Sequence, residues 1–264
     1  MHSPLGWTGL SQWSFLAAAF AAMLLTVWMV DRRRRGKDGS RAVMAALTLS
    51  TLWALVTTGV GHGAIVTQLL EVVRNLGWLA VVYSLFARDN RHTTVVQVRP
   101  VLAVLAMVEL FQLVLVLLNV RYAAFRPATA MIFELSIMFR LLLTTGALVL
   151  VHNLYAGAIS GQREAVRWTA LALALMWGYD LNFYTIAYLG RAIPIEMAAL
   201  RGVAQILSML LLAVGAMRGG SALRFSPSRA VAFQSLSLLA SIIYLTRGLR
   251  VALLLQCGLL QPRP

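Results

Sequence analysis

The chain has 264 residues, of which 60% are hydrophobic and only 12% are charged. A soluble domain of this size needs roughly 25% charged residues to cover its surface, so this composition argues against a soluble protein. The formal net charge of +14 raises the alternative of nucleic-acid binding, but the basic residues lie in short stretches between long apolar runs. We therefore expect a helical bundle in a lipid bilayer, with no nucleic-acid partner.

The first apolar run does not have the charge pattern of a cleaved signal peptide. Such a peptide carries positive charge before its apolar core and small residues at a cleavage site after it. Here no Lys or Arg precedes Trp13, whereas four arginines follow at 32–35. The run is therefore predicted to be an uncleaved anchor whose N-terminus lies outside.

The apolar runs recur along nearly the whole chain. A helix needs about 20 residues to cross the hydrocarbon core, and each span must be helical because lipid cannot satisfy backbone hydrogen bonds. The chain is thus predicted to be an all-α, polytopic transmembrane bundle of about eight spans. The predicted spans are approximately residues 11–30, 42–60, 64–86, 100–120, 130–151, 168–189, 200–217 and 230–245. Pro100 is expected to start its helix, where proline is harmless.

The basic residues are distributed unevenly between the connections. With the N-terminus outside, the inner connections hold fourteen Lys and Arg residues and the outer ones hold four, which are Arg121, Arg126, Arg191 and Arg201. This is the positive-inside pattern of membrane proteins. The outer connections, such as the tight turn at 61–63, are too short to fold as a separate sensing domain, so a ligand would have to be met within the bundle or at its outer rim.

Residues typical of catalytic and metal sites are sparse. Cys257 is the single cysteine, which excludes an intrachain disulfide, and the four histidines are too scattered in the sequence to indicate a metal site. The chain contains no H-E-x-x-H, G-x-S-x-G or Walker motif. We therefore predict no catalytic residue and no metal or other cofactor in this chain.

Six ionisable residues fall within the predicted spans. A charge at the bilayer centre costs about 2.5–3.5 kcal/mol, so each should face the bundle interior or find a partner. Glu71 and Arg74 are three residues apart on one helical face and are expected to form an internal pair, which Asn75 extends. This pair fits either a ligand- or proton-responsive site near mid-membrane or a structural ion pair that fixes helix register. The six residues are Glu71, Arg74, Glu109, Glu134, Arg140 and Asp180.

Asp180 lies in the middle of the sixth predicted span, four residues before Tyr184. Its carboxylate is expected to accept hydrogen bonds from tyrosine hydroxyl groups or to pair with Arg74 or Arg140 on another helix. The sensing candidates are accordingly Glu71, Arg74, Asp180, Tyr184, Glu134 and Arg140.

Several segments follow one another in a characteristic order along the chain. They are Glu71-x-x-Arg74 with Trp78, the segment 151–155, Tyr179-Asp180-Leu181-Asn182-Phe183-Tyr184, Arg201-Gly202, Arg218, and the segments 223–236 and 238–245. This ordered set resembles the N-terminal membrane region of the PEP-CTERM-system sensor histidine kinases, the PrsK type, over roughly residues 13–245.

This resemblance implies a multi-pass, usually dimeric sensor in the bacterial inner membrane. It also implies a cytoplasmic kinase module that binds ATP, and a partner response regulator that controls exopolysaccharide and surface-protein genes. The chain departs from that pattern after Leu245: no H-[ED]-x-x-[TN]-P phosphoacceptor or D-x-G-x-G lid is present, and the tail 246–264 diverges. Eight spans would also leave the C-terminus outside, so we expect residues 1–245 to be a membrane sensor domain without its kinase half.

Two alternatives to a sensor remain open at this stage. A small-molecule or proton-coupled transporter would use Glu71, Arg74 and Asp180 as a pathway. It would usually show paired short segments interrupted by Gly or Pro, which this sequence lacks. A purely structural membrane subunit would use the same charges for assembly only.

Overall fold

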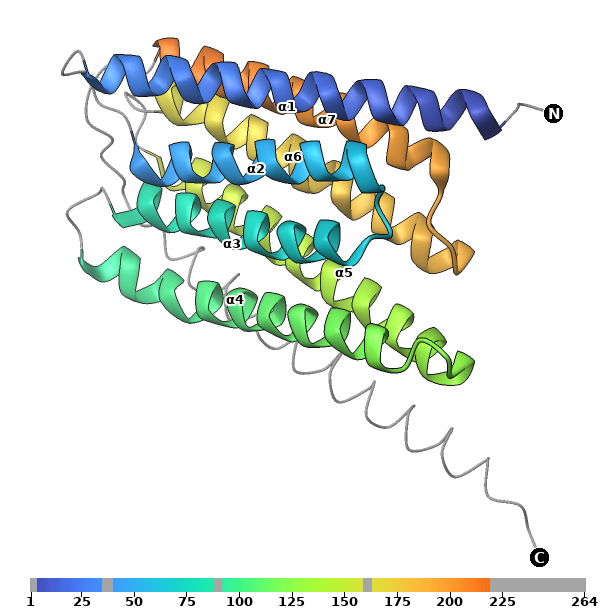
Figure 1. Ribbon diagram of the computed structural model, residues 1–264. Helices are drawn as coiled ribbons and strands as arrows, with labels where there is room; N and C mark the ends of the chain where they lie inside the picture. Colours follow the sequence, from blue (N-terminus) through green and yellow to red (C-terminus); the bar gives the residue numbers. More distant parts are fainter. Residues whose placement is uncertain (1–3, 35–39, 88–91, 159–162, 219–264) are drawn as a thin grey trace, which may run out of the picture. The chain divides into compact units, whose positions relative to one another are not determined.

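The computed structural model describes residues 4–34, 40–87, 92–158 and 163–218, and these residues form seven α-helices (Figure 1). The helices are α1 (Pro4–Arg34), α2 (Arg41–Val60), α3 (Ile65–Ala87), α4 (His92–Arg121), α5 (Arg126–Ala156), α6 (Arg163–Gly190) and α7 (Ile195–Arg218). The described part of the chain contains no strand, which confirms the predicted all-α fold class.

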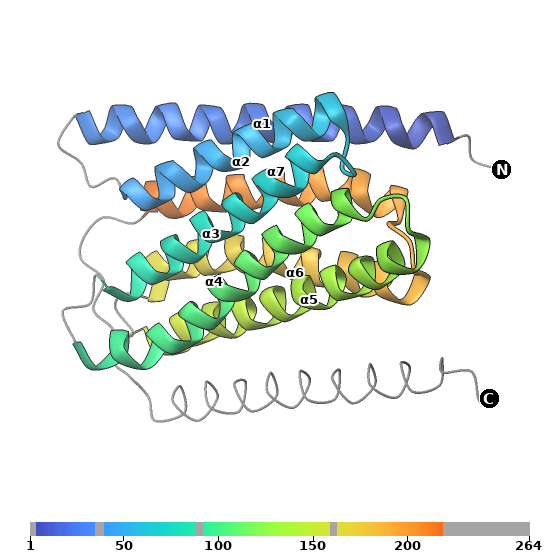
Figure 2. The ribbon, with the colours of Figure 1, turned by 60° about the horizontal axis from the view of Figure 1, so that its bottom comes forward.

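The seven helices form a closed ring. Each helix packs against the next one in the chain, and α7 returns to pack along α1. The two neighbours of α4 in the ring, α3 and α5, also contact each other to a smaller extent. Figures 1 and 2 show the helices side by side, alternating in direction, with the connections gathered at two opposite ends.

The two ends differ in charge as the sequence predicts. One end carries the C-terminus of α1, the start of α2 and the end of α7, and its arginines include Arg32, Arg33, Arg34, Arg41 and Arg218. The other end, which we call the arginine-poor end, consists of the connections 61–64, 122–125 and 191–194 with Arg121, Arg126 and Arg191 at their borders.

The outer surface of the ring is apolar, and this identifies a membrane-embedded, multi-pass protein. Soluble monomers rarely expose contiguous apolar patches larger than a few hundred Å². Here large apolar side chains are exposed along whole helices, as on α1 and α4. They include Trp13, Leu16, Phe20, Leu24, Val27, Met107, Leu110, Phe111, Val114 and Leu117.

Six of the seven described helices are long and apolar enough to cross a membrane. The exception is α6, in which Tyr179, Asp180, Asn182 and Tyr184 replace apolar residues within a short stretch. Because α6 packs between α5 and α7, the ring shields Asp180 and Tyr184 from lipid, as polar groups in a membrane require, whereas Asn182 is exposed.

Seven of the eight predicted spans coincide with the seven helices, and the eighth, at 230–245, lies outside the described residues. The expectation for Pro100 is wrong, because α4 begins at His92 and Pro100 lies inside it. Proline in a helix removes one backbone hydrogen bond. Pro100 is exposed near the arginine-rich end, where water can satisfy the carbonyl group that loses its partner.

A close approach between α1 and α7 closes the ring. The hydroxyl group of Ser14 donates a hydrogen bond to the carbonyl oxygen of Ala199 at 2.8 Å. A Cβ atom added at Gly202 would lie 2.7 Å from the backbone carbonyl carbon of Ser14. Glycine is therefore required at position 202 for the two helices to pack this closely, as at other membrane helix interfaces.

We predict that Gly202→Val separates α1 from α7 and lowers the free energy of unfolding by about 1–3 kcal/mol, the usual cost of overpacking. Gly178→Ala is the control, because a Cβ atom there meets nothing within 4 Å and alanine is the better helix former. Thermal melting of both purified variants in detergent measures the difference. Equal melting temperatures would contradict the close contact.

Candidate functional site

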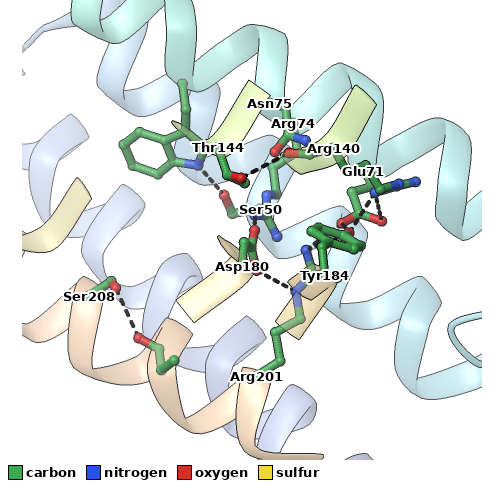
Figure 3. A network of polar contacts seen from close by, with 12 residues as sticks. Ser50, Glu71, Arg74, Asn75, Arg140, Thr144, Asp180, Tyr184, Arg201 and Ser208 are labelled. Carbon is green, nitrogen blue, oxygen red and sulfur yellow. Dashed lines mark hydrogen bonds and ion pairs between the residues drawn. The ribbon is translucent and has the colours of Figure 1, made fainter. Parts of the chain in front are cut away.

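Arg201 of α7 bridges two buried carboxylates on different helices (Figure 3). Its Nε donates to Oδ1 of Asp180 on α6 at 2.7 Å, and its Nη2 pairs with Oε1 of Glu71 on α3. All three side chains are at most 7% exposed. A charge buried in this way is stable only when it is paired, so Arg201 holds α3, α6 and α7 together.

Each carboxylate also has a second arginine partner. Oε2 of Glu71 accepts from Nη1 of Arg140 on α5 at 2.7 Å, and Oδ2 of Asp180 accepts from Nη2 of Arg74 on α3 at 3.3 Å. The five residues form a continuous series in the order Arg140, Glu71, Arg201, Asp180 and Arg74, which we call the ion chain. It joins four helices, α3, α5, α6 and α7.

Two aromatic residues complete the coordination of the ion chain. The hydroxyl group of Tyr184 donates to Oε1 of Glu71 at 2.6 Å and accepts from Nη1 of Arg140 at 2.7 Å. The Trp53 ring of α2 lies 4.1 Å from the guanidinium carbon of Arg74 and 5.0 Å from that of Arg201. These are cation–π distances, and they attach α2 to the ion chain.

The ion chain extends from the arginine-poor half of the helices to their middle. Glu71 and Arg201, with Tyr184, are each six residues from the arginine-poor end of their helices, which corresponds to a depth of about 9 Å at 1.5 Å per residue. Arg74, Asp180 and Arg140 are nine, ten and fourteen residues from that end, so Arg140 lies at the centre of α5. The position near mid-membrane that the sequence predicts stays a prediction.

A pocket of about 120 Å³ connects the ion chain with the arginine-poor end. Ion-chain residues Glu71, Arg140 and Arg201 form its deep wall together with Tyr184, and the exposed Ile193 of the α6–α7 connection lies near its mouth. Its side walls are mostly apolar and include Leu115, Val116, Ile132, Phe133, Ile137, Phe183 and Ala187.

His62, in the α2–α3 turn, also lines this pocket. Its ring packs edge-on against Phe15 at 4.7 Å between centroids, and Phe15 packs in turn against Trp53 at 5.3 Å. Burial, and to a lesser degree the positive charge of Arg201, lowers the pKa of His62 from 6.5 to about 4. His62 is therefore neutral at physiological pH.

On the arginine-rich side of the ion chain, the interior of the described ring is filled mainly by apolar side chains. Those with almost no exposed surface are Leu47, Trp78, Leu105, Leu143, Leu150, Leu154, Leu173, Trp177 and Met209. Trp78 donates from Nε1 to the Ser50 hydroxyl at 3.0 Å. Other buried polar side chains lie among these apolar ones, including Asn75, Glu109, Thr144, Asn153, Gln205 and Ser208.

The predicted pairings are partly right. Asp180 pairs with Arg74 across the bundle, as expected. The expected internal pair between Glu71 and Arg74 is wrong, because Glu71 pairs with Arg140 and Arg201 while Arg74 is turned toward Asp180. A spacing of three places two side chains on one helical face, but here partners on other helices compete for both charges.

Tyr184 also differs in detail, since its hydroxyl group binds Glu71 rather than Asp180. Asn75 shares the face of Glu71 and donates to Oε1 of the buried Glu109 at 2.9 Å.

Glu134 does not join the ion chain. Its side chain is exposed on α5 and makes no ion pair among the described residues, contrary to the expectation that each charge within a span faces the interior or finds a partner.

Arg201 is the central member of the ion chain, whereas the sequence predicts that it lies in an outer connection. It lies near the predicted start of its span, where a basic residue normally reaches water. The sequence does hold one sign of this role. The predicted spans contain four carboxylates but only two arginines, so they lack enough basic partners for the carboxylates. The predicted tight turn at 61–63 is confirmed. The sequence does not predict that His62, in this turn, lines a pocket.

The arrangement holds no set of side chains suited to a metal ion: within the described helices no group of three or more His, Cys, Asp and Glu residues is placed to bind one. Comparisons of the chain with protein-family models, with curated proteins and with solved structures find no match. The geometry of the ion chain and its pocket therefore carries the functional argument.

We predict that Asp180→Asn destabilises the protein by about 3–5 kcal/mol, because it leaves Arg74 without its charged partner in a buried position. Glu134→Gln makes the same chemical change at an exposed carboxylate and should cost less than about 0.5 kcal/mol. Chemical unfolding of both variants in mixed micelles measures the difference. Equal losses of stability would show that Asp180 is not held in a buried ion pair.

The low pKa of His62 predicts a specific pH dependence of stability. Between about pH 6.5 and pH 4 the unfolded chain binds a proton at His62 and the folded chain does not, so stability falls as the pH decreases through this range. His62→Phe keeps a ring against Phe15 and should reduce this acid-induced loss. His152→Phe, at an exposed histidine, is the control and should leave the loss of melting temperature between these pH values unchanged.

Proposed function

We propose that this chain is the membrane sensor module of a bacterial inner-membrane signalling system of the histidine kinase type. The supporting observation is a pocket that reaches from the arginine-poor end to an ion chain joining four helices. The positive-inside rule places that end on the external side of the membrane. An external cue would therefore meet the ion chain directly.

The ion chain supplies a means of converting ligand binding into helix movement. Its arginines share two carboxylates, so a ligand that pairs with one arginine changes which partner the others use. The arginines and carboxylates would then have two distinct arrangements of ion pairs. A ligand shifts the equilibrium between these arrangements by the difference in its affinity for them. The helices would transmit the change to the arginine-rich, cytoplasmic end.

The resemblance to sensor kinases of the PEP-CTERM system extends this proposal. A homodimeric kinase module, which binds ATP, would pass the signal to a response regulator of exopolysaccharide and surface-protein genes. Arg74, Asp180, Tyr184 and Arg201, four of the residues that carry the resemblance, all belong to the ion chain or coordinate it. Their place in one cluster favours a shared role in sensing.

A carrier is the competing function, because it too would need charged groups beside a pocket. A carrier exposes its site alternately to both sides of the membrane. A carrier in one of its two states would be open toward one end as this pocket is, so a measurement of flux distinguishes the carrier from the sensor.

We predict that Tyr184→Phe changes the transcript level of the exopolysaccharide genes by about fivefold or more in the bacterium that encodes this chain, since coupling free energies of about 1–3 kcal/mol correspond to about 5–150-fold. The variant removes the hydroxyl group between Glu71 and Arg140. Tyr188→Phe, one turn further along α6 and exposed, is the control and should behave as wild type.

Two results would contradict the sensor function. Deletion of the gene could leave these transcripts unchanged, or the purified chain in proteoliposomes could carry out sustained solute or proton flux that Tyr184→Phe alters. The second result would establish the carrier instead.

A further inference from the structure

The walls of the pocket carry an excess of positive charge. Two guanidinium groups, those of Arg140 and Arg201, face a single carboxylate, that of Glu71. His62 adds no charge, since its pKa is about 4. Two further carboxyl groups lie behind this wall: that of Asp180, which is shared between Arg201 and Arg74, and that of the buried Glu109, which interacts electrostatically with Arg140. In a medium of low dielectric constant, an uncompensated positive charge attracts an anion strongly.

The two arginines also have donor groups to spare. Arg140 uses only Nη1 for Glu71 and Tyr184, and Arg201 uses Nε and Nη2. Nε and Nη2 of Arg140 and Nη1 of Arg201 make no hydrogen bond with any residue that the structure describes. Guanidinium groups with free nitrogens bind carboxylates well because their planar geometry matches the two oxygen atoms.

The rest of the pocket is small and mostly apolar, with Gln68, Asn119 and Ser136 as uncharged polar residues of its lining. Aliphatic side chains such as Leu115, Val116 and Ile132 line it together with the rings of Phe133 and Phe183. Its volume of about 120 Å³ is close to the ~150 Å³ of an apolar protein cavity that holds one benzene molecule. The occupant therefore has one charged group and an apolar body no larger than a single ring.

We propose that the pocket binds a small monocarboxylate, with its carboxylate at Arg140 and Arg201 and its apolar part among Ile132, Phe133 and Phe183. The inference rests on the proposed sensor function for its biological meaning, because the bound monocarboxylate would be the external cue. The spare guanidinium nitrogens favour an anion, and the mostly apolar walls favour an organic acid over an inorganic anion.

The test uses the full chain, purified in a neutral detergent, with sodium benzoate as the probe and benzamide as its uncharged counterpart of the same shape. We expect saturable benzoate binding by calorimetry, at least about tenfold tighter than that of benzamide. Inorganic phosphate should bind at least about tenfold more weakly than benzoate. Equal binding of benzoate and benzamide, or tighter binding of phosphate, would overturn the proposal.

Two variants locate the bound molecule. Arg140→Gln should weaken benzoate binding at least about tenfold, and Ile132→Phe should block it by filling the pocket without touching a charge. Met131→Phe is the matched control, because Met131 is exposed and does not line the pocket. If Ile132→Phe bound benzoate as well as Met131→Phe, the assignment of the pocket would be wrong.

The outcome for the ligand is distinguishable from the outcome for the sensor function. Absence of benzoate binding, together with a changed transcript level in Tyr184→Phe, would reject the monocarboxylate and keep the sensor. Benzoate binding with uptake into proteoliposomes would keep the ligand class and reject the sensor.

Discussion

The sharing of Arg201 by Glu71 and Asp180 is the interaction on which the rest of this structure depends. Hydrocarbon surrounds the ring, so charges inside it must find partners there, and the partners of Arg201 lie on α3 and α6. Meeting both requires α7 to return to the ring and to pack along α1, where Gly202 permits close contact with Ser14. The same constraint positions Arg140 and Tyr184 on the wall of the pocket.

The ion chain is a weak source of stability. Burying several charges costs desolvation energy that their attraction only partly offsets, and apolar residues would often stabilise such a core as well or better. With three arginines and two carboxylates, Arg201 is shared between both carboxylates. The aromatic contacts from His62 through Phe15 to Trp53 connect the ion chain to α1 and α2.

Much of the fold could be predicted from the sequence because the length and hydropathy of each span are local properties. The ranges of seven helices follow from these two properties, and the uneven distribution of arginines between the two ends follows from the order of the connections along the chain. The ion chain could be predicted only in part, because its pairings depend on which helices become neighbours. Local spacing favoured a pair between Glu71 and Arg74, and the position of Arg201 near a span end concealed its role. The exposure of Glu134 likewise depends on the rotation of α5 within the ring.

Arg201 is in direct contact with a carboxylate 130 residues away in the chain. A double-mutant cycle measures the coupling between them: the cost in stability of Glu71→Gln is determined with and without Arg201→Gln. Glu71→Gln alone leaves buried arginines without a negative partner, and Arg201→Gln removes one of these arginines. We therefore expect Glu71→Gln to cost less in the Arg201→Gln background, by about 0.5–3 kcal/mol, the range found for residues in direct contact. An equal cost in both backgrounds would contradict this contact.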